Sequence, residues 1–442
     1  MIYNLHIIQI FENKGDVMKF LTTGEKLKRL RTQLGLKQDD LKSENVTRGL
    51  ISMMETDKRD VTYSTAVKLA EKFNEKAEEL DIIVNVDEAY LMRSPKEDAE
   101  LYCFRKLKNP EIEKISIDGI FKIANEYDLV EVKAEAYCKL GEIYFKEKEF
   151  EIACDIYKKA REIYIDIRKN EKLGHVYWKL GVFNADGLKY EAAIEYYQLS
   201  QYYCTLYKDV KTKKLCLYSL AMCYRRLNKI ELALETIEKF LSVSDEKEDF
   251  RLYFFACNTK ATCYNTKGKY DKAIDIYKDL LLKISDDKNV FLGYIYNNLG
   301  LNYSAKNDFK QSMKYFEMAA KFKNEFSKSN LSHTLIEKSE VLLKQNLIDD
   351  AIKSIKLGLE YAKEYKDLEY LLKGNYLLMD IYDKLNDNEK LEKVYINIIE
   401  LLKLTKNTKE LKDLYNELAL KYLRQNKAEI CEQYLLLSKN LK

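Results

Sequence analysis

The sequence has 442 residues, of which 46% are hydrophobic and 33% are charged, and its formal net charge is +3. Only 2 prolines and 14 glycines are present, which excludes collagen-like and linker-rich chains and argues against an all-β fold. Because the length is about three times that of a usual domain, we expect a nearly all-helical repeat array rather than one compact core.

The first seventeen residues differ in character from the rest of the chain. Residues 1–17 are apolar but lack the basic leading region and the small-residue cleavage site of a signal peptide. Residues 13–17 can be encoded by AT-rich codons with a bacterial ribosome-binding core, so we expect translation to start at Met18. Residues 1–17 are then a disordered or non-native leader. No run reaches the roughly 18 apolar residues of a membrane span, so no membrane partner is expected.

Residues 18–74 predict a small helical domain. Thr22 or Thr23 can cap a helix that carries Leu27 and Leu30, and Gly35 can end it. Further short helices are expected after Lys37, from Thr47 and from Thr62. Short helices joined by tight turns over about fifty residues are typical of a helix-turn-helix domain.

Two segments of this domain carry a more specific signal. LKRLRTQLGLKQDDL and TRGLISMMETDKR resemble the opening and recognition-helix patterns of the XRE (Cro/C1-type) family. The turn before the recognition helix is shorter than is usual in that family, and Thr56 and Asp57 replace its usual Asn-Gly or Arg-Gly. The resemblance implies binding to a double-stranded DNA operator, and that Arg31 pairs with Glu55; the alternative for Glu55 is a free surface charge.

Geometry assigns roles within the predicted DNA-binding surface. A recognition helix presents its N-terminal turn to base edges, so Arg48 is the best candidate to contact a guanine or a nearby phosphate. Gly49 leaves room for the helix to approach the DNA groove closely. Gln38 is expected to hold a phosphate at the N-terminus of the second helix. The other predicted DNA-binding residues are Thr47, Ser52, Met53, Lys58 and Arg59.

The rest of the chain repeats with a period near forty residues. Six segments align without gaps, and each carries a small residue at the same position: Ala153, Ala193, Ala233, Ala273, Ser312 and Ala351. Leu-Gly, a Tyr three residues on, and an aromatic-Ala-aromatic second half resemble tetratricopeptide repeats, whose glycine lets the two helices approach closely. We attribute the long period to a longer second helix in each repeat. The fold class predicted is therefore all-α, with a helix-turn-helix domain followed by a right-handed tetratricopeptide-repeat solenoid over residues 132–442.

The connection, residues 75–131, contains both prolines, Pro95 and Pro110. Its amphipathic stretches predict a linker helix and one or two helical hairpins outside the repeat pattern.

The stripe beside the buried face of each first helix predicts a peptide-binding groove on the concave side. Asparagine amides there can satisfy the backbone of an extended peptide, aromatic rings can form pockets, and Arg225 can take a terminal carboxylate. The alternative is a solvated face in which Trp178 is ordinary core. The predicted peptide-binding residues are Trp178, Tyr218, Arg225, Phe255, Asn258, Asn265, Tyr294 and Asn297.

Nine cysteines without a C-x-x-C pair, and only 3 histidines, predict reduced core thiols in a cytoplasmic protein, with no metal and no cofactor. The sequence carries no nucleophile, base and phosphate-loop motifs, so we do not expect an enzyme.

A repressor-type head joined to tetratricopeptide repeats resembles the RRNPP superfamily of cytoplasmic peptide-sensing regulators. The resemblance implies a transcription regulator of quorum sensing that binds a short signalling peptide. The apolar last helix, with Tyr434, Leu435, Leu436 and Leu437 in succession, favours a homodimer. The alternative function is a constitutive DNA-binding protein whose solenoid is a protein-interaction scaffold.

Overall fold

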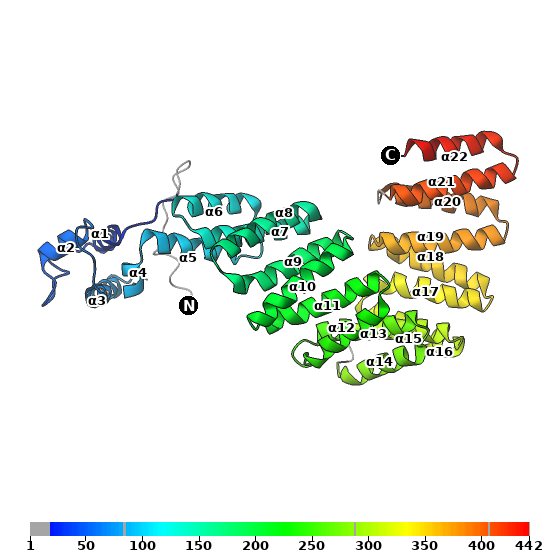
Figure 1. The fold of residues 1–442 in the computed structure, drawn as a ribbon, viewed down its shortest axis with the longest axis horizontal. Helices are drawn as coiled ribbons and strands as arrows, with labels where there is room; N and C mark the ends of the chain where they lie inside the picture. Colours follow the sequence, from blue (N-terminus) through cyan, green and yellow to red (C-terminus); the bar gives the residue numbers. More distant parts are fainter. Residues whose placement is uncertain (1–17, 83–84, 287–288, 405–406, 442) are drawn as a thin grey trace. The chain divides into compact units, whose positions relative to one another are not determined.

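The computed structural model describes residues 18–82, 85–286, 289–404 and 407–441, and every regular element in these ranges is a helix. The predicted leader lies outside the described residues. The chain divides into two units, Met1–Phe240 and Leu241–Lys442 (Figure 1). Within the described residues, no helix is both long and apolar enough to cross a membrane. The expected all-α fold is confirmed.

The first unit begins with a head of four helices around one core. Thr22 caps the first helix in a reciprocal capping box with Glu25, and Gly35 adopts the left-handed backbone (φ 68°) after its last turn. Both predicted ends of this helix are confirmed. Leu27, Ile51 and Leu69 lie in the core of the head. The head helices are α1 (Thr23–Gln33), α2 (Arg48–Met54), α3 (Tyr63–Glu79) and α4 (Glu88–Met92).

The helix predicted after Lys37 is absent, and that prediction was wrong. Residues 38–41 form turns, and the Asp40 carboxylate accepts a hydrogen bond of 2.7 Å from the Lys37 backbone N–H. Ser43 and Val46 then pair as an isolated antiparallel bridge. Aspartate side chains that bond nearby backbone groups compete with helix formation, and the bridge leaves too short a segment for a helix to extend.

The connection between head and repeats contains one hairpin. Residue 74 lies inside α3, so the head continues past the boundary that we expected. Pro95 occupies the first turn of the next helix, where its missing N–H costs nothing. Apolar side chains of this hairpin, including Ala99, Ile117 and Ile120, form one cluster with Phe20. Its helices are α5 (Pro95–Leu107) and α6 (Lys114–Glu126).

Antiparallel helix pairs follow along the rest of the first unit (Figure 1). They are α7 (Val130–Lys146) with α8 (Phe150–Asp166) and α9 (Leu173–Asp186) with α10 (Tyr190–Leu206); a 3-10 turn, η2 (Asn170–Lys172), precedes α9. Helix α11 (Val210–Arg226) packs against α10 and is followed by α12 (Ile230–Ser242). In the first pair both helices have 17 residues, so the long period comes from both helices and not from a longer second helix alone.

The marker residues of the repeats are buried as predicted. All six small residues, Ala153 and its equivalents, are fully inaccessible to solvent. The repeat glycines leave space for the aromatic ring of the facing helix. A Cβ atom at Gly141 would lie 2.4 Å from the Tyr157 ring, and one at Gly181 would lie 2.4 Å from the Tyr197 ring. Glycine therefore makes room for a tyrosine ring at the helix crossing.

The second unit continues the same construction through residue 441. Its helices are α13 (Phe250–Thr266), α14 (Tyr270–Lys283), α15 (Phe291–Ala305), α16 (Phe309–Phe326), η3 (Lys328–Asn330), α17 (Leu331–Lys344), α18 (Ile348–Glu364), α19 (Leu368–Lys384), α20 (Asn388–Leu404), α21 (Thr408–Arg424) and α22 (Ala428–Asn440). Its core clusters contain Leu280 and Leu299 near its start and Ile398 and Leu414 near its end.

The nine cysteines are all free thiols, as predicted, and all except Cys138 are buried. Burial raises the pKa of the Cys204 thiol to about 11. The Cys204 thiol therefore stays protonated at neutral pH, and the buried cysteines pack as small apolar residues.

Candidate functional site

Helix α2 presents the predicted recognition surface of the head. Thr47 is its N-cap residue, and its hydroxyl accepts a hydrogen bond from the backbone N–H of Leu50 (3.3 Å). The Arg48 side chain is 65% exposed and lies 3.5 Å from the Asp39 carboxylate. Ser52 and Met53 are also exposed on this helix. The first turn of α2 thus leaves its arginine available to an external anion or base edge.

Gly49 lies in the same turn and faces open space. A Cβ built there would meet only the Thr47 hydroxyl, at 4.0 Å. The fold therefore does not require glycine at this position. Gly24 differs, because its Cβ would lie 2.3 Å from the Met54 carbonyl where α1 crosses the end of α2.

Gln38 is tied into the head. Its amide nitrogen donates to the Glu55 carboxylate (2.9 Å), and Arg31 donates to both oxygens of that carboxylate (2.5 and 3.0 Å). Burial alone would raise the pKa of Glu55, but the hydrogen bonds from Arg31 and Gln38 hold it below its ordinary value. The implied pairing of Arg31 with Glu55 is confirmed. Because no helix begins at Gln38, the predicted helix N-terminus at that position is absent.

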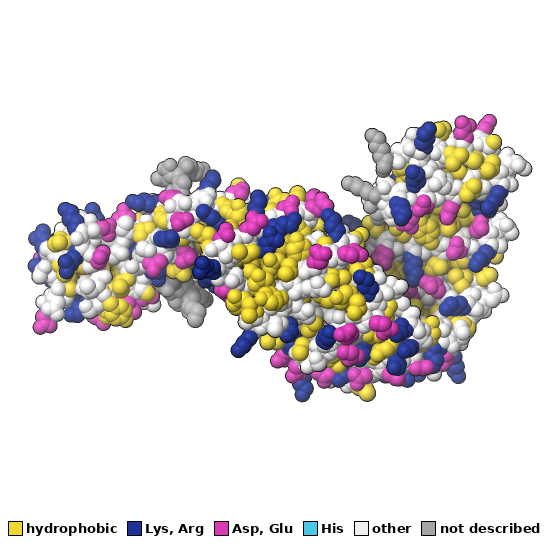
Figure 2. Space-filling model, in the orientation of Figure 1, with side chains coloured by type: hydrophobic (Ala, Val, Ile, Leu, Met, Phe, Trp, Pro, Cys, Tyr) yellow, Lys and Arg dark blue, Asp and Glu magenta, His cyan; other side chains and the backbone are white. Residues whose placement is uncertain are grey.

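Lys58 and Arg59 follow α2 and are exposed. The backbone reaches them through Asp57, which has a left-handed backbone (φ 54°) and whose carboxylate accepts hydrogen bonds from Thr22 and Gly24. This links the residues after the recognition helix to the start of α1. Figure 2 shows Lys and Arg side chains over the end of the head that carries α1 and α2.

In the first unit, the predicted peptide residues lie on α9 and α11. The Trp178 indole donates to the Ser219 hydroxyl (3.3 Å) and is partly buried. Tyr218 lines a pocket of about 350 Å³ between these helices, together with Asp186, Tyr190 and Arg226. The Arg225 Nε atom is buried and has no hydrogen-bond partner among the described residues. These helices therefore offer a side-chain pocket and an unpaired donor.

In the second unit, the predicted residues Asn258 and Asn265 each form a hydrogen bond with an asparagine of the next repeat. The Asn258 carbonyl oxygen accepts from Tyr277 (2.9 Å) and from Asn298 on the next first helix (3.2 Å). Asn265 donates to Asn302 (3.0 Å). Phe255 and Tyr294, predicted as pocket rings, are partly buried and 37% exposed, respectively.

Asn297 is not at the surface where the sequence placed it. Its side chain is 8% exposed, its nitrogen donates to Glu337 (2.6 Å), and its oxygen accepts from Thr334 (2.7 Å). Both groups of this amide are therefore engaged inside the protein. The stripe used for the prediction did not include Thr334 and Glu337 of α17, which bond to Asn297.

A buried polar network around Glu337 was missed. Glu337 also accepts a hydrogen bond from Tyr370 on α19 (2.5 Å), and Lys323 on α16 is only 2% exposed. Burial lowers the pKa of Lys323 to about 8, and the nearby charge of Glu337 opposes that shift. The spacing offered a signal: Asn297 and Glu337 lie one repeat of 40 residues apart, and so do Asn258 and Asn298.

Across the described residues, no cluster of His, Cys, Asp and Glu is arranged to hold a metal ion.

Comparisons with known proteins agree with this architecture. The family described as a helix-turn-helix domain matches residues 24–81, and the tetratricopeptide repeat matches residues 134–164, 216–247, 256–282 and 293–326. No curated protein matches the sequence.

Several solved structures are similar to the chain. The apo form of the quorum sensor NprR from B. thuringiensis is 19% identical with a TM-score of 0.52, and the match covers 78% of this chain and 99% of that one. NprR in complex with its cognate peptide NprX is 17% identical (TM-score 0.45, 79% and 99% covered). The apo form of RapI is 17% identical (TM-score 0.42, 70% and 97% covered). The chain thus combines a helix-turn-helix domain with tetratricopeptide repeats and has the fold of the apo NprR structure.

Proposed function

We propose that this protein is a DNA-binding transcription regulator whose repeats sense a short signalling peptide. The observation that carries the proposal is the combination, in one chain, of an exposed recognition helix with a fold that matches the apo NprR structure over 78% of this chain and 99% of that one. Arg48, Thr47 and Gly49 read DNA from the first turn of α2. No catalytic role is part of the proposal.

Each unit offers its own candidate peptide contacts on the first helices of its repeats. In the first unit, the Tyr218 pocket takes a side chain and the partly buried Arg225 guanidinium takes a carboxylate. In the second unit, the nitrogen of Asn258 and the oxygen of Asn265 have no partner among the described residues, so each can bond a peptide backbone. Asn297 is nearly buried and bonds to Thr334 and Glu337, so it is not one of the peptide contacts.

The test is to purify the protein from its native host and identify the retained peptides by mass spectrometry. We expect a peptide of about five to ten residues, and we expect it to be lost from the Asn258→Ala/Asn265→Ala variant. Thr266→Ala, on the exposed side of the same helix, is the control and should retain it. Retention of no peptide by the wild-type protein would overturn the peptide-sensing function.

We also propose a homodimer formed through the last repeat, because one small head offers few DNA contacts and two heads double them. Five leucines of α21 and α22 are each 46–55% exposed: Leu420, Leu423, Leu435, Leu436 and Leu437. Exposed apolar side chains gathered on neighbouring helices mark a protein contact. Light scattering at micromolar concentration without DNA should give a dimer for the wild type and a monomer for Leu435→Asp/Leu436→Asp. A wild-type monomer would contradict this interface.

One surface favours the scaffold alternative. Leu199, Tyr202 and Leu206 form an exposed apolar stripe on α10, and Figure 2 shows hydrophobic side chains gathered over the region of α9 and α10. Exposed apolar area of this kind marks protein contacts. A protein partner captured by wild type but not by Tyr202→Glu, combined with an empty peptide site, would support that function instead.

A further inference from the structure

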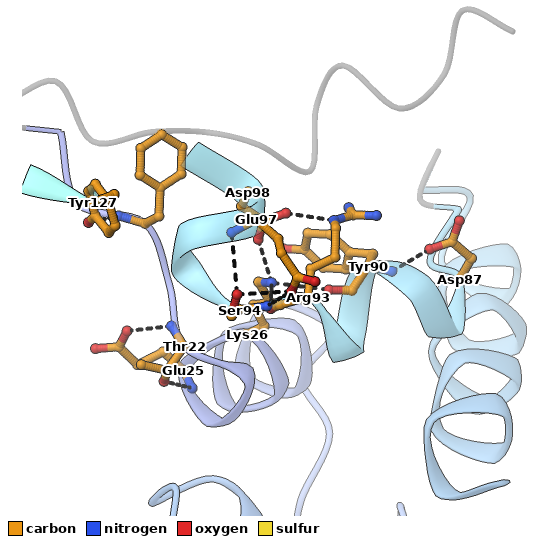
Figure 3. Close-up of polar contacts among 11 residues, drawn as sticks. Thr22, Glu25, Lys26, Asp87, Tyr90, Arg93, Ser94, Glu97, Asp98 and Tyr127 are labelled. Carbon is orange, nitrogen blue, oxygen red and sulfur yellow. Dashed lines mark hydrogen bonds and ion pairs between the residues drawn. The ribbon is translucent and has the colours of Figure 1, made fainter. Parts of the chain in front are cut away.

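The head is joined to the α5–α6 hairpin by a buried lysine. Lys26 lies on α1 and is only 1% exposed. Its ammonium donates to the backbone carbonyls of Tyr90 (3.1 Å) and Arg93 (2.6 Å) and forms an ion pair with Asp98 on α5 (Figure 3). A buried ammonium is costly unless its hydrogens find acceptors, and here each acceptor lies outside α1.

The acceptors of Lys26 are themselves held in place. Ser94 caps α5 in a capping box with Glu97, and Asp98 lies in the first turn of that helix, where its negative charge is favourable. Asp98 also accepts a hydrogen bond from the Arg93 guanidinium (2.7 Å). Residues 93–98, RSPKED, therefore hold two acceptors, the Arg93 carbonyl and the Asp98 carboxylate, in place for the Lys26 ammonium.

A second attachment lies just before α1. Phe20 is 5% exposed and packs edge-on against Tyr102 and Tyr127, with ring centroids 5.7 and 5.5 Å apart. Its backbone N–H also donates to the Tyr127 hydroxyl (3.2 Å). Phe20 belongs to the apolar cluster of α5 and α6, not to the core of the head. Only Leu21 separates it from Thr22, the cap of α1.

We propose that Phe20 and Lys26 form a latch that makes the head and the α5–α6 hairpin move as one body, so that events at the DNA surface and at the repeats are coupled through it. Lys26 and Asp98 are then positioning residues. The proposal rests on DNA binding by the head, as set out in the proposed function. Buried ion pairs contribute little net stability compared with apolar residues of similar size, but they fix one arrangement. Removing both charges should therefore loosen the latch without unfolding the head.

The test uses hydrogen–deuterium exchange on the full chain and on Lys26→Met/Asp98→Leu. Without DNA, we expect amides at residues 18–22 and 93–98 to exchange at least tenfold faster in the variant, with α2 and the second unit unchanged. The matched control is Lys76→Met/Glu79→Leu, which removes an exposed ion pair of α3 and should change neither segment. Unchanged exchange at residues 18–22 and 93–98 in the variant would overturn the latch.

The second readout adds the tightest duplex recovered by selection from random sequences. In wild type, the duplex should slow exchange in α2 and also in α5 and α6; in the latch variant, it should slow exchange in α2 alone. Protection of α5 and α6 that persists in the variant, or is missing from wild type, would overturn the coupling. If no duplex binds, the DNA-binding function fails, while the experiment without DNA still decides whether the latch exists.

Discussion

The recognition helix and the first helices of the second unit use polar side chains in opposite ways. On α2, Arg48 and Ser52 are exposed and the core lies on the other face. On α15, Asn297 is almost fully buried and bonded to α17. Arg48 is thus available for a ligand at little cost to the fold, whereas Asn297 joins neighbouring repeats. Substitution of Arg48 should therefore change binding without changing stability, and substitution of Asn297 should change stability.

The largest effect is expected from Arg48→Ala. If the guanidinium reads a base, operator affinity should fall roughly tenfold to hundredfold, which is about 1–3 kcal/mol, and specificity should relax at one position. The free energy of unfolding should stay within about 0.5 kcal/mol, because the side chain is exposed. Fluorescence anisotropy with a selected duplex measures the first, and urea unfolding the second. Lys76→Ala removes the same charge from α3, so an equal loss there would show that only overall charge matters.

Asn297→Ala should act in the opposite way. It leaves Glu337 and Thr334 each without one partner in a buried site, so the free energy of unfolding should fall by about 1–3 kcal/mol. DNA affinity of the folded protein should not change. Thr266→Ala, exposed on α13, is the control for urea unfolding. A loss no larger than that of the control would mean that the amide is not part of a buried network.

Lys323, a buried charged residue of the second unit, should make the free energy of unfolding depend on pH. Its folded pKa of about 8 lies below the ordinary value of 10.5, so the unfolded chain binds more protons between these values. The free energy of unfolding should therefore rise as pH increases from 8 to 10.5, by an amount on the order of 1–3 kcal/mol. Lys323→Met should flatten that rise when the two proteins are unfolded in urea across this range. If the free energy of unfolding depends on pH in the same way in the two proteins, the pKa of Lys323 is not lowered in the folded state.

The smallest effect is expected at Gly49. Gly49→Ala places a methyl group in open space and improves helix propensity, so the unfolding free energy should rise by up to about 1 kcal/mol. The methyl group should still hinder close approach to DNA and weaken operator binding several-fold. Thermal unfolding and anisotropy report the two effects. Unchanged DNA affinity would remove Gly49 from the interface.

Sequence reasoning succeeded where local rules govern structure. The helix cap at Thr22, the glycine after α1 and the small residues of six repeats were predicted from the sequence, and all are confirmed. It failed at one local and one distant contact. After Lys37, the Asp40 carboxylate bonds the Lys37 backbone N–H and the segment forms turns instead of a helix. Asn297 bonds to Glu337 of the next repeat, a pairing that depends on which helices pack together and for which the 40-residue period was the available clue.

The central claim is that DNA binding by the head responds to a peptide held by the repeats. The most direct test titrates a selected duplex with the full chain, in the presence and absence of the peptide fraction extracted from protein purified from its native host. We predict that the peptide changes the Kd for DNA at least fivefold in one direction, because allosteric coupling is typically about 1–3 kcal/mol. An identical Kd with and without peptide, while calorimetry shows that the peptide is bound, would contradict the account.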